Sequence, residues 1–272
     1  MMWKLALLSL VTVWLPIQAT DVFDLRLKRE EGKVWAVRER QKITMQNPGV
    51  PGKLQNIVTM DIRHRVKAIA EDGQVTMELT ITRVDSGQSY MNQMLDFSVL
   101  IDIPLIVIEE RSGKVIGMTR PDELPEEAIP AFEHYRSQLM SYGLDMFVPN
   151  RTVSEGETWQ NQFPIAIDVG DHSLESMVEM NYEMMGEQLV DGKKLTKVQF
   201  KGKFTGSFKD GVTGSLSGAV DGSYLFDEQI GDMVMIELQT KEHHSTTAAE
   251  GEVNRIFELD VKSERVPLEA IR

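Results

Sequence analysis

Long blocks of strictly alternating apolar and polar residues constrain this chain more than any other feature. From Val58 to Ala68 the apolar residues and His64 would share one face, while the charged residues take the other. A period of two is typical of a β-strand with one buried face, because successive side chains point to opposite sides. The Asp72-Gly73 turn leads into a second alternating run that begins at Val75. We therefore predict a long antiparallel hairpin with one face in water.

The same pattern occurs twice in the chain. Glu31-Gly32-Lys33-Val34-Trp35 and Glu155-Gly156-Glu157-Thr158-Trp159 lie 124 residues apart, and each opens an alternating block. Two later pairs of turns keep the same order, at offsets of 119 and 118 residues. Hairpins in β-rich chains can resemble one another by chance, but ordered offsets favour a divergent tandem duplication. The predicted fold is mostly β, with two related curved antiparallel sheets and one amphipathic helix between or across them.

A helix is predicted between the two blocks. Apolar residues recur at helical spacing from Ala128 through Phe132 and Tyr135 to Tyr142, and Pro130 is tolerated only in a first turn. The regular helix should therefore span residues 129–142. The predicted organisation is a signal peptide at 1–19, a first β unit at 20–120, a linking helix at 121–147 and a second β unit at 148–272.

The N-terminus has the pattern of an export signal. Lys4 is followed by an apolar run from Leu5 to Leu15, by Pro16 and by a small residue, Ala19. The apolar run is too short to span a bilayer, and no later segment reaches that length. We expect an exported protein, periplasmic or extracellular, with no transmembrane segment after cleavage. The chain has no cysteine, which excludes disulfides, thiolate metal sites and a lipid-anchoring cysteine.

Composition and motifs argue against several functions. Without Lys4 the chain has 28 basic and 42 acidic residues, a net charge of −14, which disfavours nucleic acid as a partner. The sequence contains no G-x-S-x-G, H-E-x-x-H, phosphate loop or EF-hand pattern. The neighbouring His243 and His244 would point to opposite faces of a strand. We predict no enzyme, no catalytic residue, no metal site and no cofactor.

The candidate ligand-binding residues lie on the predicted inner faces. His64 sits among apolar residues, where it is either a hydrogen-bonded core histidine or part of a cavity floor. Methionines on these faces are either core residues or the lining of a cavity for acyl chains, because thioethers adapt to varied apolar partners. The predicted ligand-binding residues are His64, Met60, Met77, Met180, Met184, Phe132 and Tyr135. Gly214, Gly218 and Gly222 share one face, where small residues leave room for a bend, the helix or a ligand.

The chain resembles an uncharacterised bacterial family of exported proteins that is classed as a domain of unknown function. The resemblance rests on the strand and turn from Leu25 to Trp35, the Val153 to Trp159 unit and a hairpin at Phe226 to Leu238. It implies no catalytic residue. A curved antiparallel sheet with a helix across it is also similar, by analogy of fold alone, to the half-barrel of lipoprotein carriers.

Two functions remain open from the sequence. The first is non-catalytic binding of an apolar ligand, a lipid or a lipidated partner in a concave, methionine-lined face. The alternative is a structural or protein–protein interaction module of the cell envelope. An enclosed apolar cavity would favour the first, and a filled core with an exposed apolar patch would favour the second.

Overall fold

The computed structural model describes residues 21–46, 52–86, 96–141, 143–169, 172–208, 214–248 and 251–271. The predicted signal peptide lies outside these residues. The strands are β1 (Val22–Asp24), β2 (Val34–Gln46), β3 (Leu54–Ile69), β4 (Val75–Ser86), β5 (Pro104–Glu109), β6 (Val115–Thr119), β7 (Thr152–Ser154), β8 (Thr158–Val169), β9 (His172–Val190), β10 (Lys193–Phe208), β11 (Gly214–Asp227), β12 (Asp232–Ala248) and β13 (Gly251–Val266). The helix α1 spans Ile129–Ser141, and short 3-10 turns are η2 (Phe97–Leu100), η3 (Glu126–Ala128), η4 (Leu144–Met146) and η5 (Leu268–Ala270).

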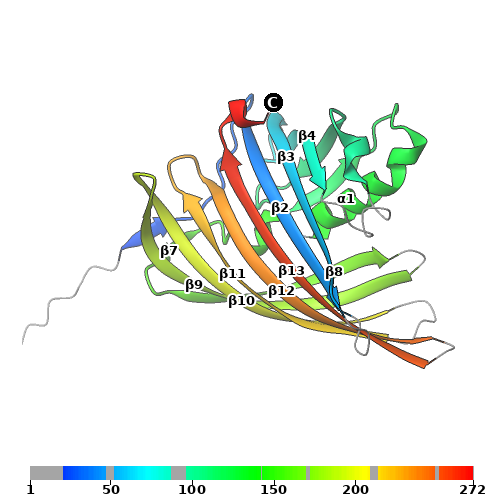
Figure 1. Ribbon diagram of the computed structural model, residues 1–272. Helices are drawn as coiled ribbons and strands as arrows, with labels where there is room; N and C mark the ends of the chain where they lie inside the picture. Colours follow the sequence, from blue (N-terminus) through cyan, green and yellow to red (C-terminus); the bar gives the residue numbers. More distant parts are fainter. Residues whose placement is uncertain are drawn as a thin grey trace, which may run out of the picture.

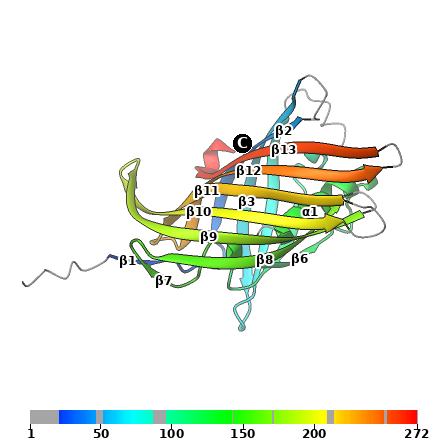
Figure 2. The same cartoon turned by 90° about the horizontal axis from the view of Figure 1, so that it is seen from below.

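Eleven strands form one antiparallel sheet in the order β6-β5-β4-β3-β2-β13-β12-β11-β10-β9-β8, and β1 pairs with β7 separately. The large sheet is curved and twisted, so that β2 and β3 cross the direction of β9 to β12 (Figures 1 and 2). The helix α1 contacts both edge strands, β6 and β8. We call the face of the sheet that turns toward α1 the inner face.

The prediction of a mostly β, antiparallel fold with one helix is confirmed for the described residues. The two predicted units, however, are halves of one sheet rather than two sheets. The first half is β2 to β6, the second half is β8 to β12, and β13 lies between them, paired with both β2 and β12. This pairing satisfies two long strand edges that would otherwise present unpaired backbone groups. The predicted domain boundaries stay a prediction.

The two Glu-Gly-x-x-Trp units have the same hydrogen-bond register. In the first half, Gly32 N donates to Val66 O, and Val66 N donates to Lys33 O. In the second half, Gly156 N donates to Met184 O, and Met184 N donates to Glu157 O. Both glycines have positive φ, at 79° and 75°, a conformation that side chains rarely adopt. The units are therefore strand-entry turns of equivalent geometry, which supports the predicted duplication.

The apolar residues of the inner face pack into two separate core clusters. The first core cluster joins the inner faces of β3, β4 and β5 to η2 and α1. The second core cluster joins β8 to β12 to the chain around β1, η4 and β7. Each half therefore has its own cover, built from a different part of the chain.

The helix begins and ends close to the predicted residues. It spans Ile129–Ser141, with Pro130 in its first turn, and residue 142 lies outside the described part of the chain. Phe132 and Tyr135 are buried in the first core cluster, as the helical spacing predicts. The helix thus covers the first half and reaches the far edge strand β8.

Aromatic rings of β10 fill the space beside the strand glycines. A Cβ atom at Gly222 would lie 2.6 Å from the ring of Phe200, and one at Gly218 would collide with the ring of Phe204. The ring of one strand packing over a neighbouring glycine is a known way to stabilise a sheet. The predicted free space at Gly218 and Gly222 is therefore occupied by phenylalanines of the adjacent strand rather than by the helix or a ligand.

Candidate ligand-binding face

The middle of the inner face is only half-buried, although its two flanks are packed. Residues that pair across an antiparallel sheet share a face, so the register carries the inner face from Met60 of β3 across β2 and β13 to Ile236 of β12. We call the half-buried apolar residues between the two flanks the central lane. They are Ile43 and Met45 of β2, Phe257, Leu259 and Val261 of β13, and Leu238 of β12, which also packs against the second core cluster.

Polar side chains border the central lane on the two adjoining strands. On β2, Gln41 Nε2 donates to Glu39 Oε1 at 2.5 Å, and burial raises the pKa of Glu39. Glu39 itself is partly accessible. On β12, His244 Nε2 lies 2.9 Å from Glu242 Oε2, and its ring packs 4.5 Å from that of Phe257.

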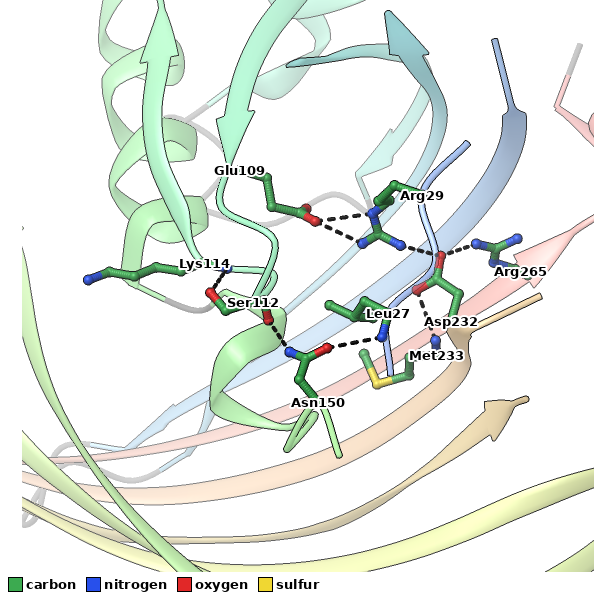
Figure 3. Close-up of polar contacts among 9 residues, drawn as sticks. All are labelled: Leu27, Arg29, Glu109, Ser112, Lys114, Asn150, Asp232, Met233 and Arg265. Carbon is green, nitrogen blue, oxygen red and sulfur yellow. Dashed lines mark hydrogen bonds and ion pairs between the residues drawn. The ribbon is translucent and has the colours of Figure 1, made fainter. Parts of the chain in front are cut away.

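Four charged residues form a buried cluster, which we call the charge cluster: Arg29, Glu109, Asp232 and Arg265 (Figure 3). Arg29 donates through Nε to Glu109 Oε1 at 3.1 Å, and its Nη1 lies 3.1 Å from Asp232 Oδ2. Arg265 also donates to Asp232 Oδ2. The four side chains are between 4% and 17% exposed, Arg265 being the most exposed. Burial lowers the pKa of Arg265 and raises that of Glu109.

The charge cluster ties the two halves together through the N-terminal segment. Glu109 ends β5 in the first half, Asp232 begins β12 in the second, and Arg29 comes from the chain between β1 and β2. The same segment is held at Leu27, whose N donates to Asn150 Oδ1 at 3.0 Å, while Asn150 Nδ2 donates to Ser112 O (Figure 3). Residues from three distant parts of the chain are therefore fixed around one segment.

Trp35 and His64 lie against the charge cluster. Their rings stack at 5.1 Å, and the Arg265 and Arg29 guanidinium carbons lie 4.8 and 5.8 Å from the Trp35 ring centre. Burial, with the nearby positive charges of Arg265 and Arg29, lowers the pKa of His64 to about 3. His64 Nε2 is buried without a hydrogen-bond partner. The absence of a partner at Nε2 concerns one ring nitrogen, so the core-histidine and cavity-floor interpretations of His64 both stay predictions.

The predicted ligand-binding residues are not gathered in one place. Met60, Met77, Phe132 and Tyr135 are buried in the first core cluster, whereas Met180 and Met184 are buried in the second. The register separates Met60 from Met184 by six strand spacings, roughly 29 Å along the sheet. Their contact with a ligand stays a prediction, and other residues form the central lane between them.

The sequence reasoning missed Arg29 and Arg265. Arg29 lies outside any periodic segment, so no pattern marks it as buried. Arg265 continues the parity of Phe257, Leu259 and Val261, which places it on the inner face of β13. This alternation is the feature of the sequence that could have indicated an inward-facing Arg265. His243 and His244 take opposite faces, as expected from strand geometry: His243 pairs with Ser217 and Ile256 on the outer face.

The outer face of β10 to β13 carries an open depression of about 440 Å³. Its outward side chains are polar, and they include the Lys201–Asp221 pair at 3.6 Å and the Glu237–Lys262 pair at 3.5 Å. This depression is not an enclosed apolar cavity.

Within the described ranges, no group of three or more histidine and acidic side chains is arranged to hold a metal ion. No helix in that part of the chain is long and apolar enough to cross a membrane.

Comparison with known proteins assigns no family. No family model and no curated protein matches the chain. Among solved structures, it is similar to lipovitellin, with a TM-score of 0.49, 11% identity, and coverage of 88% of this chain and 26% of the other. The hypothetical lipoprotein YmcC from Escherichia coli aligns with a TM-score of 0.26, 7% identity, and coverage of 83% and 86%. A DUF1329 family protein from Desulfovibrio piger aligns with a TM-score of 0.21, 9% identity, and coverage of 88% and 92%. The chain thus spans about a quarter of the lipovitellin chain.

Proposed function

We propose that this protein is an exported, non-catalytic binding protein. The apolar part of its ligand lies along the central lane. One observation carries the proposal: an apolar row crosses the middle of the inner face half-buried, while both flanks of the same face are packed. Apolar surface left between packed flanks gains free energy when a ligand removes it from water. The outer face of the same strands is polar, as expected of a face in water. The inner face instead presents the half-buried apolar row, as expected of a binding face.

The sheet also supplies the means to hold such a ligand. The lane is floored by β12, β13 and β2, three strands paired along most of their length. A site built on paired strands keeps its shape better than one built on loops. Polar side chains beside the lane, among them Gln41 and Thr240, offer hydrogen bonds at its borders.

A pair of matched variants tests the proposal. Leu259→Glu places a charge on the inner face of β13, and Ile256→Glu places one on the outer face of the same strand, also at a half-buried position. Binding of a fluorescent fatty-acid probe and the lipid content seen by native mass spectrometry are measured for both proteins. We expect Leu259→Glu to weaken binding by about 10-fold or more, because a charge against a hydrocarbon chain is costly. Ile256→Glu should bind as the parent protein does. Equal effects of the two changes, or no binding by the parent protein, would contradict the proposal.

An envelope interaction module is the second candidate, and one observation favours it. Strand β9 exposes three large apolar side chains, Leu189 at 70%, Met177 at 45% and Met185 at 40%. Exposed apolar side chains on a soluble protein often mark a contact with a partner. Photo-crosslinking in cells from position 189 and from position 259 separates the two candidates. A defined protein adduct from position 189 alone, together with no lipid in the purified protein, would favour the interaction module.

A further inference from the structure

Three residues that contact the Trp35 ring each carry a buried polar atom without a hydrogen-bond partner. These atoms are His64 Nε2, Arg29 Nη1 and Arg265 Nε. Arg29 Nη1 lies within ion-pair distance of Asp232 but is not aligned for a hydrogen bond. Buried polar groups are nearly always paired, so His64 Nε2 and Arg265 Nε in particular require an explanation.

The chemistry of these atoms is that of hydrogen-bond donors. Both guanidinium nitrogens carry hydrogen and cannot accept. The neutral imidazole of His64 can carry its proton on Nε2, which makes the third atom a donor as well. Donors on residues that surround one ring match an oxygen anion, since carboxylate and phosphate oxygens accept several hydrogen bonds at once.

This donor group lies at one end of the central lane. Arg265 pairs with Val37 on the inner face, the next inner pair is Ser263 with Glu39, and the lane begins at Val261. From Arg265 to Phe257 the chain advances eight residues, about 26 Å of extended strand. Charge, then polar, then apolar residues therefore follow one another along a single strand.

We infer that the ligand of the central lane is an amphiphile with an acidic head group, a carboxylate or phosphate that accepts hydrogen bonds from Arg265 and Arg29. Its hydrocarbon chain runs along β13 and β2 toward Phe257. The inference rests on the proposed function, because it names the ligand class of the same site. Arg265 is the first contact, since it is the most exposed member of the charge cluster.

The charge cluster can accommodate the added negative charge. Arg29 and Arg265 are formally balanced by Glu109 and Asp232, so an anion leaves one excess negative charge. Glu109 is the group that can take up a proton, because burial already raises its pKa. Asp232 stays bonded to both arginines and to Met233 N, and it holds the guanidinium groups in place.

Calorimetric titration with dodecanoate, with uncharged dodecanol and with acetate tests the inference. We expect dodecanoate to bind about 10-fold to 100-fold more tightly than dodecanol, the range of a charge-assisted hydrogen bond. In Arg265→Gln the acid should lose this advantage while dodecanol binds as before, which also shows that the variant is folded. Arg255→Gln is the matched control, an inner-face arginine of β13 at the opposite end of the lane, and should keep the preference.

Each other outcome overturns a defined part of the account. Equal binding of acid and alcohol by the parent protein would refute the acidic head group and leave lane binding standing. Acetate that binds as tightly as dodecanoate would refute the amphiphile. An unchanged preference in Arg265→Gln would refute the role of the charge cluster. Binding of none of the three would remove the proposed function and this inference with it.

Discussion

The two tryptophan stacks occupy equivalent places in the two halves, but the charged side chains beside them differ in burial. Trp159 stacks on Tyr182 at 5.1 Å, as Trp35 stacks on His64. The Tyr182 hydroxyl donates to Met146 O, so the second half pairs its polar group with the covering backbone. In the first half the ring that replaces tyrosine has an unpaired nitrogen facing two arginines. Arg151 lies 5.7 Å from the Trp159 ring centre, but it and its partner Glu157 are partly exposed, so the same backbone geometry carries an accessible ion pair in one half and a buried charge cluster in the other.

The two halves also differ in the segments that complete them. The second core cluster is closed by its own neighbours in sequence, β7 and η4, with β1 alongside. The first half borrows Arg29 from the N-terminal segment, Asp232 from the second half and Arg265 from β13. A site assembled from three parts of the chain forms only when the whole sheet is complete.

Removal of the shared carboxylate should have the largest effect. In Asp232→Ala two largely buried guanidinium groups lose a common partner, and we expect a loss of about 3–5 kcal/mol of unfolding free energy. Urea denaturation measures it. Asp221→Ala, which breaks the exposed pair with Lys201, should stay within about 0.5 kcal/mol. Similar losses in both variants would show that the charge cluster does not join the halves.

The strand glycines of the second half should be the next most sensitive positions. A Cβ atom in Gly222→Ala would collide with Glu237 O and lie 2.6 Å from the Phe200 ring, and we expect a cost of about 1–3 kcal/mol. In the first half, a Cβ atom at Gly117 would meet Ile108 at an ordinary 3.9 Å, so Gly117→Ala should change stability by less than about 0.5 kcal/mol. Thermal unfolding of the two variants decides the point. A tolerated Gly222→Ala would show that β11 is not packed against Phe200 and the β12 backbone as described.

Replacement of each stacking partner by phenylalanine should change the unfolding free energy by different amounts in the two halves. Tyr182→Phe leaves the buried Met146 carbonyl without its donor and should cost about 1–3 kcal/mol. His64→Phe removes a nitrogen that has no partner, so the cost should stay below about 1 kcal/mol. Both are measured without ligand, by urea denaturation. A larger cost at His64 than at Tyr182 would mean that the imidazole is bonded in solution.

The pH dependence of stability should be the smallest of these effects near neutral pH, because the His64 contribution develops only below about pH 6.5. His64 has a lowered pKa, so the unfolded chain takes up the proton first, and stability falls as pH decreases from about 6.5 toward 3. The His64 contribution is at most about 1.4 kcal/mol per pH unit, taken as the difference between the parent protein and His64→Phe. Tyr182→Phe should show the pH slope of the parent. Equal slopes for the parent and His64→Phe would place the His64 pKa near its usual value.

Much of the fold follows from local patterns. Alternation from Val58 onward fixes which residues of β3 face inward, the glycine turns fix the hairpins, and the spacing of Phe132 and Tyr135 places α1. The pairing of β2 with β13 could not be predicted in this way. Alternation states which face a residue takes, not which strand lies beside it, and this pair joins the beginning of the chain to its end.

Only part of the candidate site could be predicted from the sequence. The sequence shows His64 as a polar residue on an apolar face. The alternation of inner and outer residues along β13 places Arg265 on the inner face. Arg29, Glu109 and Asp232 stand at strand ends or between strands, where periodicity carries no information. The inner-face methionines were placed on the correct faces but belong to two packed flanks, because sheet order, unknown from sequence, separates them.

The most direct test of ligand binding in the central lane is a crystal structure of the protein with terminally brominated dodecanoate. The account predicts the carboxylate at Arg265 and the bromine between Val261 and Leu259, with the chain along β13 and β2. Bromine at the outer-face depression around Lys201 and Asp221, or an inner face that stays empty while the ligand binds in solution, would contradict it.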